Sequence, residues 1–237
     1  MYVGLSFLGA STSALAVNFL FRVIYVIIGI GLYVGRRLFS YLGVVSRVEE
    51  HRDDVVAVMD SLGIERAVVW GFSAGANLAV AIAVKYPRRV SAIIDHDGIG
   101  DQDLCEDPRR SGRLEMAKSV HEKGWGNWMK EVMLGDSEPT AVDREMMAED
   151  TEMVALQLEE WTKWKGPVSV LPRLKMPILR LVSGKNEEET IRQIESSRRE
   201  NVEVRVIPGK NHGQLCRESE HASAIVNRFL ASVVCKS

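Results

Sequence analysis

Apolar and polar positions alternate between short β-branched runs and longer stretches with an apolar helical face. The alternation of strand and helix patterns is typical of an α/β protein. The predicted strands are Ala67–Trp70, Val90–Ile94, Pro177–Val182 and Val202–Ile207. The apolar faces of the first and last predicted helices contain Val48, Val55, Val58, Met59 and Leu62, and Ala222, Ile225, Val226, Phe229, Leu230 and Val233.

The strand at Ala67–Trp70 runs directly into Gly71-Phe72-Ser73-Ala74-Gly75, and an alanine-rich helical pattern follows as far as Pro87. This is a G-x-S-x-G motif between a strand and a helix, the arrangement that exposes a nucleophilic serine on a sharp turn. Ser73 is therefore the predicted nucleophile. The free amide of Ala74 and the helix dipole are expected to stabilise an oxyanion there.

On these residues the chain from about Val48 to its end resembles the α/β-hydrolase superfamily. The resemblance implies a mostly parallel sheet flanked by helices, with a small helical cap over the active site. We expect one α/β-hydrolase domain over residues 1–237 with the cap inserted at about 100–174. Trp125, Trp128, Trp161 and Trp164 lie in that region; they would either line an acyl or alcohol pocket or simply pack the cap onto the body.

A serine hydroxyl needs a base, and the family's order is nucleophile, acid, histidine. His212 matches the base because it follows the last predicted strand in the loop Pro208–Gly213. His51 and His221 fall on predicted helices and are expected to be solvated. His121 lies in the cap, where we expect a surface position, and His96 follows a strand.

The acid has several candidates. Glu187 lies three residues after Gly184, in the loop after the penultimate strand, and is the first choice. If that loop aligns one residue shorter, neutral Asn186 takes the position and the triad is damaged. Alternatively, Asp95 or Asp97 supplies the acid from the strand after the nucleophile helix, as in some family members.

The first third of the chain departs from the family pattern. No His-Gly occurs, so Gly9 and Ala10, after the apolar run Val3–Leu8, are the candidates for the second oxyanion amide. Arg22–Ile28 would be the next strand, and we expect the first one or two strands of the fold to be missing. This apolar segment is open to three interpretations: native strands, a membrane anchor ahead of Arg36 and Arg37, or a truncated or frame-shifted gene.

Composition and charge limit the partners and cofactors that the protein is expected to have. A net charge of −2 without a basic patch argues against nucleic-acid partners. Three scattered cysteines show neither metal spacing nor a disulfide framework, which favours a reducing compartment such as the cytoplasm. We expect no metal, no cofactor and no membrane association, and make no prediction of oligomeric state.

Together these features predict a serine hydrolase that cleaves a small carboxylic ester through an acyl-enzyme. The alternative is a non-catalytic, degenerate hydrolase-fold protein, because the acid is weakly defined and the N-terminal segment is aberrant.

Overall fold

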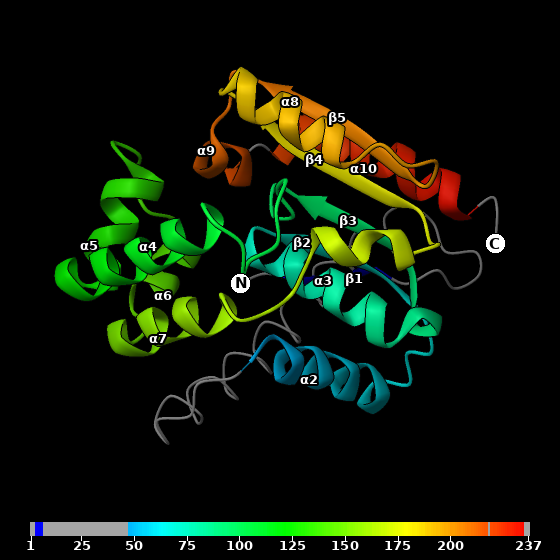
Figure 1. Cartoon of the computed structure of the whole chain (residues 1–237), viewed down its shortest axis with the longest axis horizontal. Helices are drawn as coiled ribbons and strands as arrows, with labels where there is room; N and C mark the ends of the chain where they lie inside the picture. Colours follow the sequence, from blue (N-terminus) through cyan, green and yellow to red (C-terminus); the bar gives the residue numbers. More distant parts are fainter. Residues whose placement is uncertain (1–2, 7–46, 218, 235–237) are drawn as a thin grey trace.

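A five-stranded sheet forms the centre of the computed structural model, which describes residues 3–6, 47–217 and 219–234 (Figure 1). The strands lie in the order β1-β2-β3-β4-β5. Neighbours from β2 to β5 pair in parallel, whereas β1 pairs antiparallel to β2. The strand bounds are Val3–Ser6 for β1, Ala67–Phe72 for β2, Val90–His96 for β3, Ile178–Gly184 for β4 and Val202–Pro208 for β5.

Side chains that alternate along the strands build two apolar layers, one on each face of the sheet. On one face, Val69, Ile93 and Ile178 pack with helices α2 (Val48–Ser61) and α3 (Ala74–Lys85). On the other, Val68, Ile94 and Leu179 pack with α10 (Ser219–Val234). Helices thus cover both faces, as continuous apolar strands require.

Between β3 and β4 the chain forms a group of helices that lies to one side of the sheet, which we call the inserted helices (Figure 1). They share an apolar core of their own around Val120, Trp125, Trp128 and Ala155. They comprise α4 (Arg109–Lys123), α5 (Trp125–Trp128), the π-helical turn Met129–Leu134, α6 (Ala141–Met147) and α7 (Thr151–Trp161). Two further helices follow β4 and β5: α8 (Glu187–Ser196) and α9 (His212–Arg217).

The predicted α/β class and the mostly parallel sheet with flanking helices are confirmed. The predicted strand Arg22–Ile28 lies outside the described residues, as does the rest of the apolar N-terminal segment except β1 (Val3–Ser6). None of the helices among residues 47–217 and 219–234 is both long and apolar enough to cross a bilayer.

Candidate active site

The turn between β2 and α3 holds Ser73 in a conformation that side chains rarely adopt, with φ 52° and ψ −121°. Such a backbone is strained for any residue with a Cβ and persists only where its surroundings fix it. Gly71 makes the turn sterically feasible, because a Cβ on it would lie 2.1 Å from the carbonyl carbon and oxygen of Gly75. The turn leaves Ser73 immediately ahead of the first turn of α3.

His212 reaches Ser73 from the other end of the chain, at the first position of α9 rather than in a loop. Asn211 and Gln214 cap this short helix reciprocally. The Gln214 amide donates to Asn211 Oδ1 at 2.8 Å, and the Asn211 amide donates to Gln214 Oε1 at 3.1 Å. Phe72 stacks on the imidazole with ring centroids 4.8 Å apart, and this contact restrains the ring's orientation.

The imidazole lies between a hydroxyl and a carboxylate. His212 Nε2 is 3.0 Å from Ser73 Oγ, and His212 Nδ1 is 2.9 Å from Asp97 Oδ2. The backbone amide of Ser183 donates to the other Asp97 oxygen at 2.8 Å. Serine, histidine and aspartate therefore form one continuous hydrogen-bonded chain.

Asp97 is almost completely buried, whereas the His212 side chain is 40% exposed. Burial by itself would raise the pKa of the Asp97 carboxyl. Hydrogen bonds from His212 and Ser183, together with attraction to the imidazole, instead hold that pKa below its ordinary value. The carboxyl is therefore ionised at neutral pH and stabilises positive charge on His212.

Glu187, the first choice from sequence, does not lie at His212. It is exposed at the first position of α8, where Glu187, Glu188 and Glu189 form an acidic first turn that suits the helix dipole. Asn186 is the N-cap of the same helix, and its side chain accepts the Glu189 amide at 3.1 Å. The loop after β4 thus starts a helix, and the carboxylate at the histidine comes from the turn after β3.

Asp95, the other alternative, binds groups other than His212. Its carboxylate accepts Arg180 Nε at 2.9 Å, and both side chains are fully buried. It also accepts the amides of Gly98 and Ile99, at 2.8 and 3.3 Å. Asp95 therefore anchors the turn that carries Asp97 and does not approach the imidazole.

Replacing Arg180 by methionine is expected to lower the free energy of unfolding by about 3–5 kcal/mol, because it leaves the Asp95 carboxylate buried and unpaired. Chemical denaturation measures this directly. Arg205 on β5 offers a matched control, since its pair with Glu203 is solvent-exposed. Arg205→Met should change stability by less than about 1 kcal/mol. Equal effects of the two variants would contradict a structural role for the buried pair.

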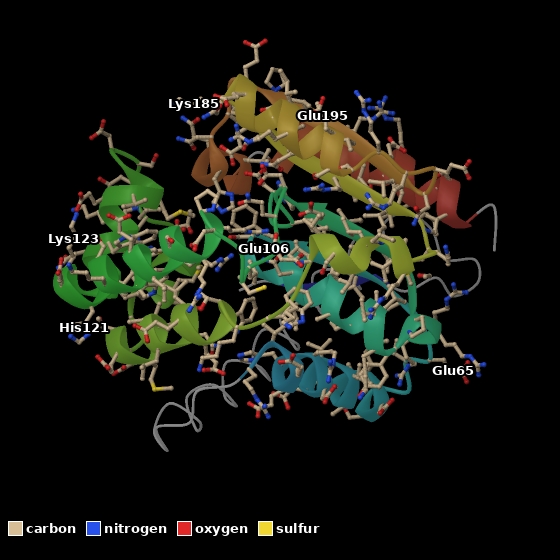
Figure 2. The ribbon with its side chains drawn as sticks, viewed as in Figure 1. Glu65, Glu106, His121, Lys123, Lys185 and Glu195 are labelled. Carbon is tan, nitrogen blue, oxygen red and sulfur yellow. The ribbon has the colours of Figure 1, made fainter. Side chains whose placement is uncertain are left out.

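Among the remaining histidines, His96 contacts Ser73 through its backbone, since the Ser73 amide donates to the His96 carbonyl at 3.0 Å. Burial lowers the pKa of His96, which stays neutral between the rings of Trp70 and Phe72. His51 was expected to be solvated, and this was wrong: it is buried, and its Nε2 lies 3.1 Å from Gln157 Oε1 of α7. His121 lies on the outer side of the inserted helices and pairs with Glu152 (Figure 2). The His221 side chain lies outside the described part of the structure.

Of the predicted oxyanion donors, only the Ala74 amide lies in the described part of the structure. Ala74 is the first residue of α3, so its amide has no acceptor within the helix. Gly9 and Ala10 lie outside the described residues. Across residues 47–217 and 219–234, no group of three or more His, Cys, Asp or Glu side chains is arranged to hold a metal ion.

The tryptophans of the inserted region pack against neighbouring apolar residues. Trp125 and Trp128 stack with centroids 5.5 Å apart inside the core of the inserted helices, and Trp125 Nε1 donates to the Met146 carbonyl at 2.7 Å. Trp161 is buried in the apolar core that includes α2 and α3, and Trp164 packs against this core.

Comparison with known proteins identifies this architecture. The family described as "alpha/beta hydrolase fold" matches residues 10–116. A thermophilic esterase from Thermogutta terrifontis superposes with a TM-score of 0.66 at 23% identity, over 80% of this chain and 74% of the esterase. A carboxylesterase from the thaumarchaeon Nitrososphaera gargenis gives a TM-score of 0.65 at 19% identity, over 81% and 75% of the two chains. The chain has the α/β-hydrolase fold.

The family match begins at residue 10, so it includes the apolar segment from that residue onward. Among curated proteins, the zearalenone hydrolase of Cladophialophora bantiana is 33% identical over 81 residues. That match covers 30% of this chain and 31% of the relative. The chain thus matches less than a third of that hydrolase's length.

Three residues near the site had not been singled out from sequence: Arg109, Arg180 and Ser183. Arg180 carried a signal, since it is a lone charge inside the apolar strand Ile178–Val182. Ser183 acts through its backbone amide, and Arg109 binds backbone carbonyls, so neither belongs to a motif.

Proposed function

We propose that the protein is a serine hydrolase that cleaves carboxylic esters through a covalent acyl-enzyme. The observation that carries the proposal is the chain of contacts from Ser73 through His212 to Asp97, with distances of 3.0 and 2.9 Å. The strained turn at Ser73 supports it, because that turn exposes the hydroxyl beside the free amides of α3.

The protonation states follow from the partners. An ionised carboxylate only accepts hydrogen bonds, so the proton of a neutral His212 lies on Nδ1, facing Asp97. Nε2 then carries the lone pair and accepts the Ser73 hydroxyl proton. This is the tautomer that a general base needs for attack by serine.

In the first half-reaction, Ser73 Oγ attacks the ester carbonyl while His212 Nε2 takes its proton. The tetrahedral oxyanion accepts a hydrogen bond from the Ala74 amide. We expect a second backbone amide, near Gly9 or Ala10, to donate to the same oxyanion. When the carbonyl reforms, the bond to the alcohol oxygen breaks. His212 returns the proton to that oxygen, and the alcohol leaves.

In the second half-reaction, water takes the place of the alcohol. His212 removes a proton from the water, the resulting hydroxide attacks the acyl-enzyme, and Ser73 leaves with the proton that His212 returns. The products are a carboxylic acid and the free enzyme. Asp97 stabilises the imidazolium in both halves and stays ionised throughout.

The inserted helices would form the cap of a single-domain enzyme, as the sequence predicted. Esterases among the structural relatives support the ester class, and a small-molecule ester is the proposed substrate. The non-catalytic alternative loses its main argument, the doubtful acid, because a buried carboxylate lies at His212.

Activity-based labelling of the purified wild-type chain tests the proposal. A fluorophosphonate probe should modify Ser73 alone, as peptide mass spectrometry would show, and p-nitrophenyl esters should be hydrolysed. Heat-denatured protein is the control for non-specific labelling. An unlabelled Ser73 in folded protein would support the degenerate-hydrolase alternative instead.

A further inference from the structure

The turn Asp97–Gln102 carries the carboxylate and also contacts the nucleophile. Asp97 itself has a positive φ of 57°. Gly98 lies directly against the serine turn, since a Cβ on it would be 2.0 Å from the Ser73 carbonyl oxygen. A shift of this turn would therefore move the acid relative to His212 and disturb Ser73 as well.

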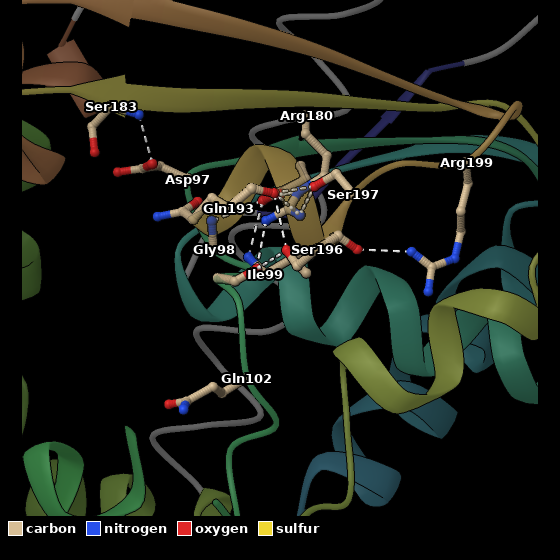
Figure 3. Close-up of polar contacts among 12 residues, drawn as sticks. Asp97, Gly98, Ile99, Gln102, Arg180, Ser183, Gln193, Ser196, Ser197 and Arg199 are labelled. Carbon is tan, nitrogen blue, oxygen red and sulfur yellow. Dashed lines mark hydrogen bonds and ion pairs between the residues drawn. The ribbon is translucent and has the colours of Figure 1, made fainter. Parts of the chain in front are cut away.

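The main body of the protein holds one side of the turn (Figure 3). Asp95 accepts the amides of Gly98 and Ile99, and Arg180 Nη2 donates to the Gly100 carbonyl at 2.9 Å. Arg180 is itself held by Ser197 and Asp95. These contacts leave the carbonyls of Gly98, Ile99 and Gln102 to other donors.

Arg109 supplies those donors from the first position of α4. Its guanidinium donates to the carbonyls of Gly98 and Gln102, each at 2.6 Å, and also to the carbonyl of Ile99. A planar guanidinium spreads its N–H donors over three nitrogens in a fixed fork, whereas a lysine ammonium offers its donors from a single atom. Backbone carbonyls on either side of one turn are thus bound to a single side chain of the inserted helices.

We infer that Arg109 is a positioning residue, through which the inserted helices hold the Asp97 turn in the geometry that orients His212. The inference rests on the proposed function, because it assigns Arg109 an effect on the same catalytic chain. The inserted helices then have a second role beyond covering the site: they complete the support of the acid. Arg109 binds only backbone oxygens in this arrangement and acts through Asp97.

Arg109→Ala tests the inference. A misplacement of about 1 Å at a catalytic group costs about 10²-fold in rate, so kcat and the fluorophosphonate labelling rate should fall by about that factor while KM changes little. Arg109→Lys should fall between alanine and the wild type. Arg110→Ala is the matched control: Arg110 is the exposed next residue on α4, and its loss should leave the rate unchanged.

A double-mutant cycle with Asp97→Asn separates positioning from a general loss of structure. If Arg109 acts through Asp97, adding Arg109→Ala to Asp97→Asn should slow labelling by less than about threefold. A full multiplicative loss in the double variant would overturn the inference. Thermal unfolding of each variant is measured alongside, and Arg109→Lys carries the same cycle if the alanine variant does not fold.

The labelling experiment distinguishes a failure of the proposed function from a failure of the positioning role of Arg109. A wild-type chain that is not labelled at Ser73 contradicts the proposed function. Normal wild-type labelling with an Arg109→Ala variant as fast as Arg110→Ala contradicts the positioning role alone.

Discussion

Replacing Ser73 by alanine is expected to abolish fluorophosphonate labelling and to lower ester hydrolysis by about 10⁴- to 10⁶-fold. The substitution removes the attacking oxygen but keeps the Cβ, so the turn between β2 and α3 and its contact with Gly98 are preserved. Initial rates on p-nitrophenyl butyrate measure the effect, and circular dichroism checks the fold.

Ser61→Ala is the control for this prediction, because Ser61 is an exposed serine at the end of α2 whose hydroxyl bonds only to the Val58 carbonyl. It should keep full activity and labelling. Comparable hydrolysis by the Ser73→Ala and Ser61→Ala variants would remove Ser73 as the nucleophile and the acyl-enzyme with it.

The second large effect is expected for Asp97→Asn, which should reduce turnover by about 10⁴-fold. The amide has nearly the same shape and still accepts the Ser183 amide through its oxygen. It carries no negative charge to stabilise the imidazolium, and its NH₂ group favours the wrong tautomer of His212. Turnover and labelling rate at neutral pH measure the loss.

Glu187→Gln provides the matched comparison, since it neutralises the carboxylate that the sequence pattern favoured. Glu187 is exposed at the start of α8, so turnover should stay close to that of the wild type. Asn186→Asp should likewise give no gain. A larger loss of turnover in Glu187→Gln than in Asp97→Asn would show that the acid is Glu187, in the loop after β4.

The sequence predicted those parts of the fold that depend on local sterics and periodicity. The strand–turn–helix around Ser73 follows from two glycines, a β-branched run and an alanine-rich helix. The pattern of β2 to β5 follows from apolar runs bounded by turn residues. His212 could be proposed from its place after the last strand, although the capping pair Asn211 and Gln214 turns that loop into the start of a helix.

The acid could not be decided from sequence because β3 and β4 are neighbouring parallel strands that end at the same edge. The Asp97 amide donates to the Leu181 carbonyl at 2.8 Å, and the Ser183 amide donates to the Asp97 side chain. Turns after either strand therefore open close to the histidine. The choice depends on which carboxylate lies at the histidine. The side chains that contact the Asp97 turn, Arg180 on β4 and Arg109 on α4, belong to no motif that the sequence displays.

Ser73 and Asp97 both belong to one β-α-β unit, formed by β2, α3 and β3, whereas His212 arrives only after β5. The exposed turn at Lys185, between β4 and α8, separates these two groups along the chain (Figure 2). A cut at that turn would leave the proposed nucleophile and acid in one fragment and the proposed base in the other. Hydrolysis would then report fragment complementation, which makes this turn a natural division point for a split-enzyme reporter.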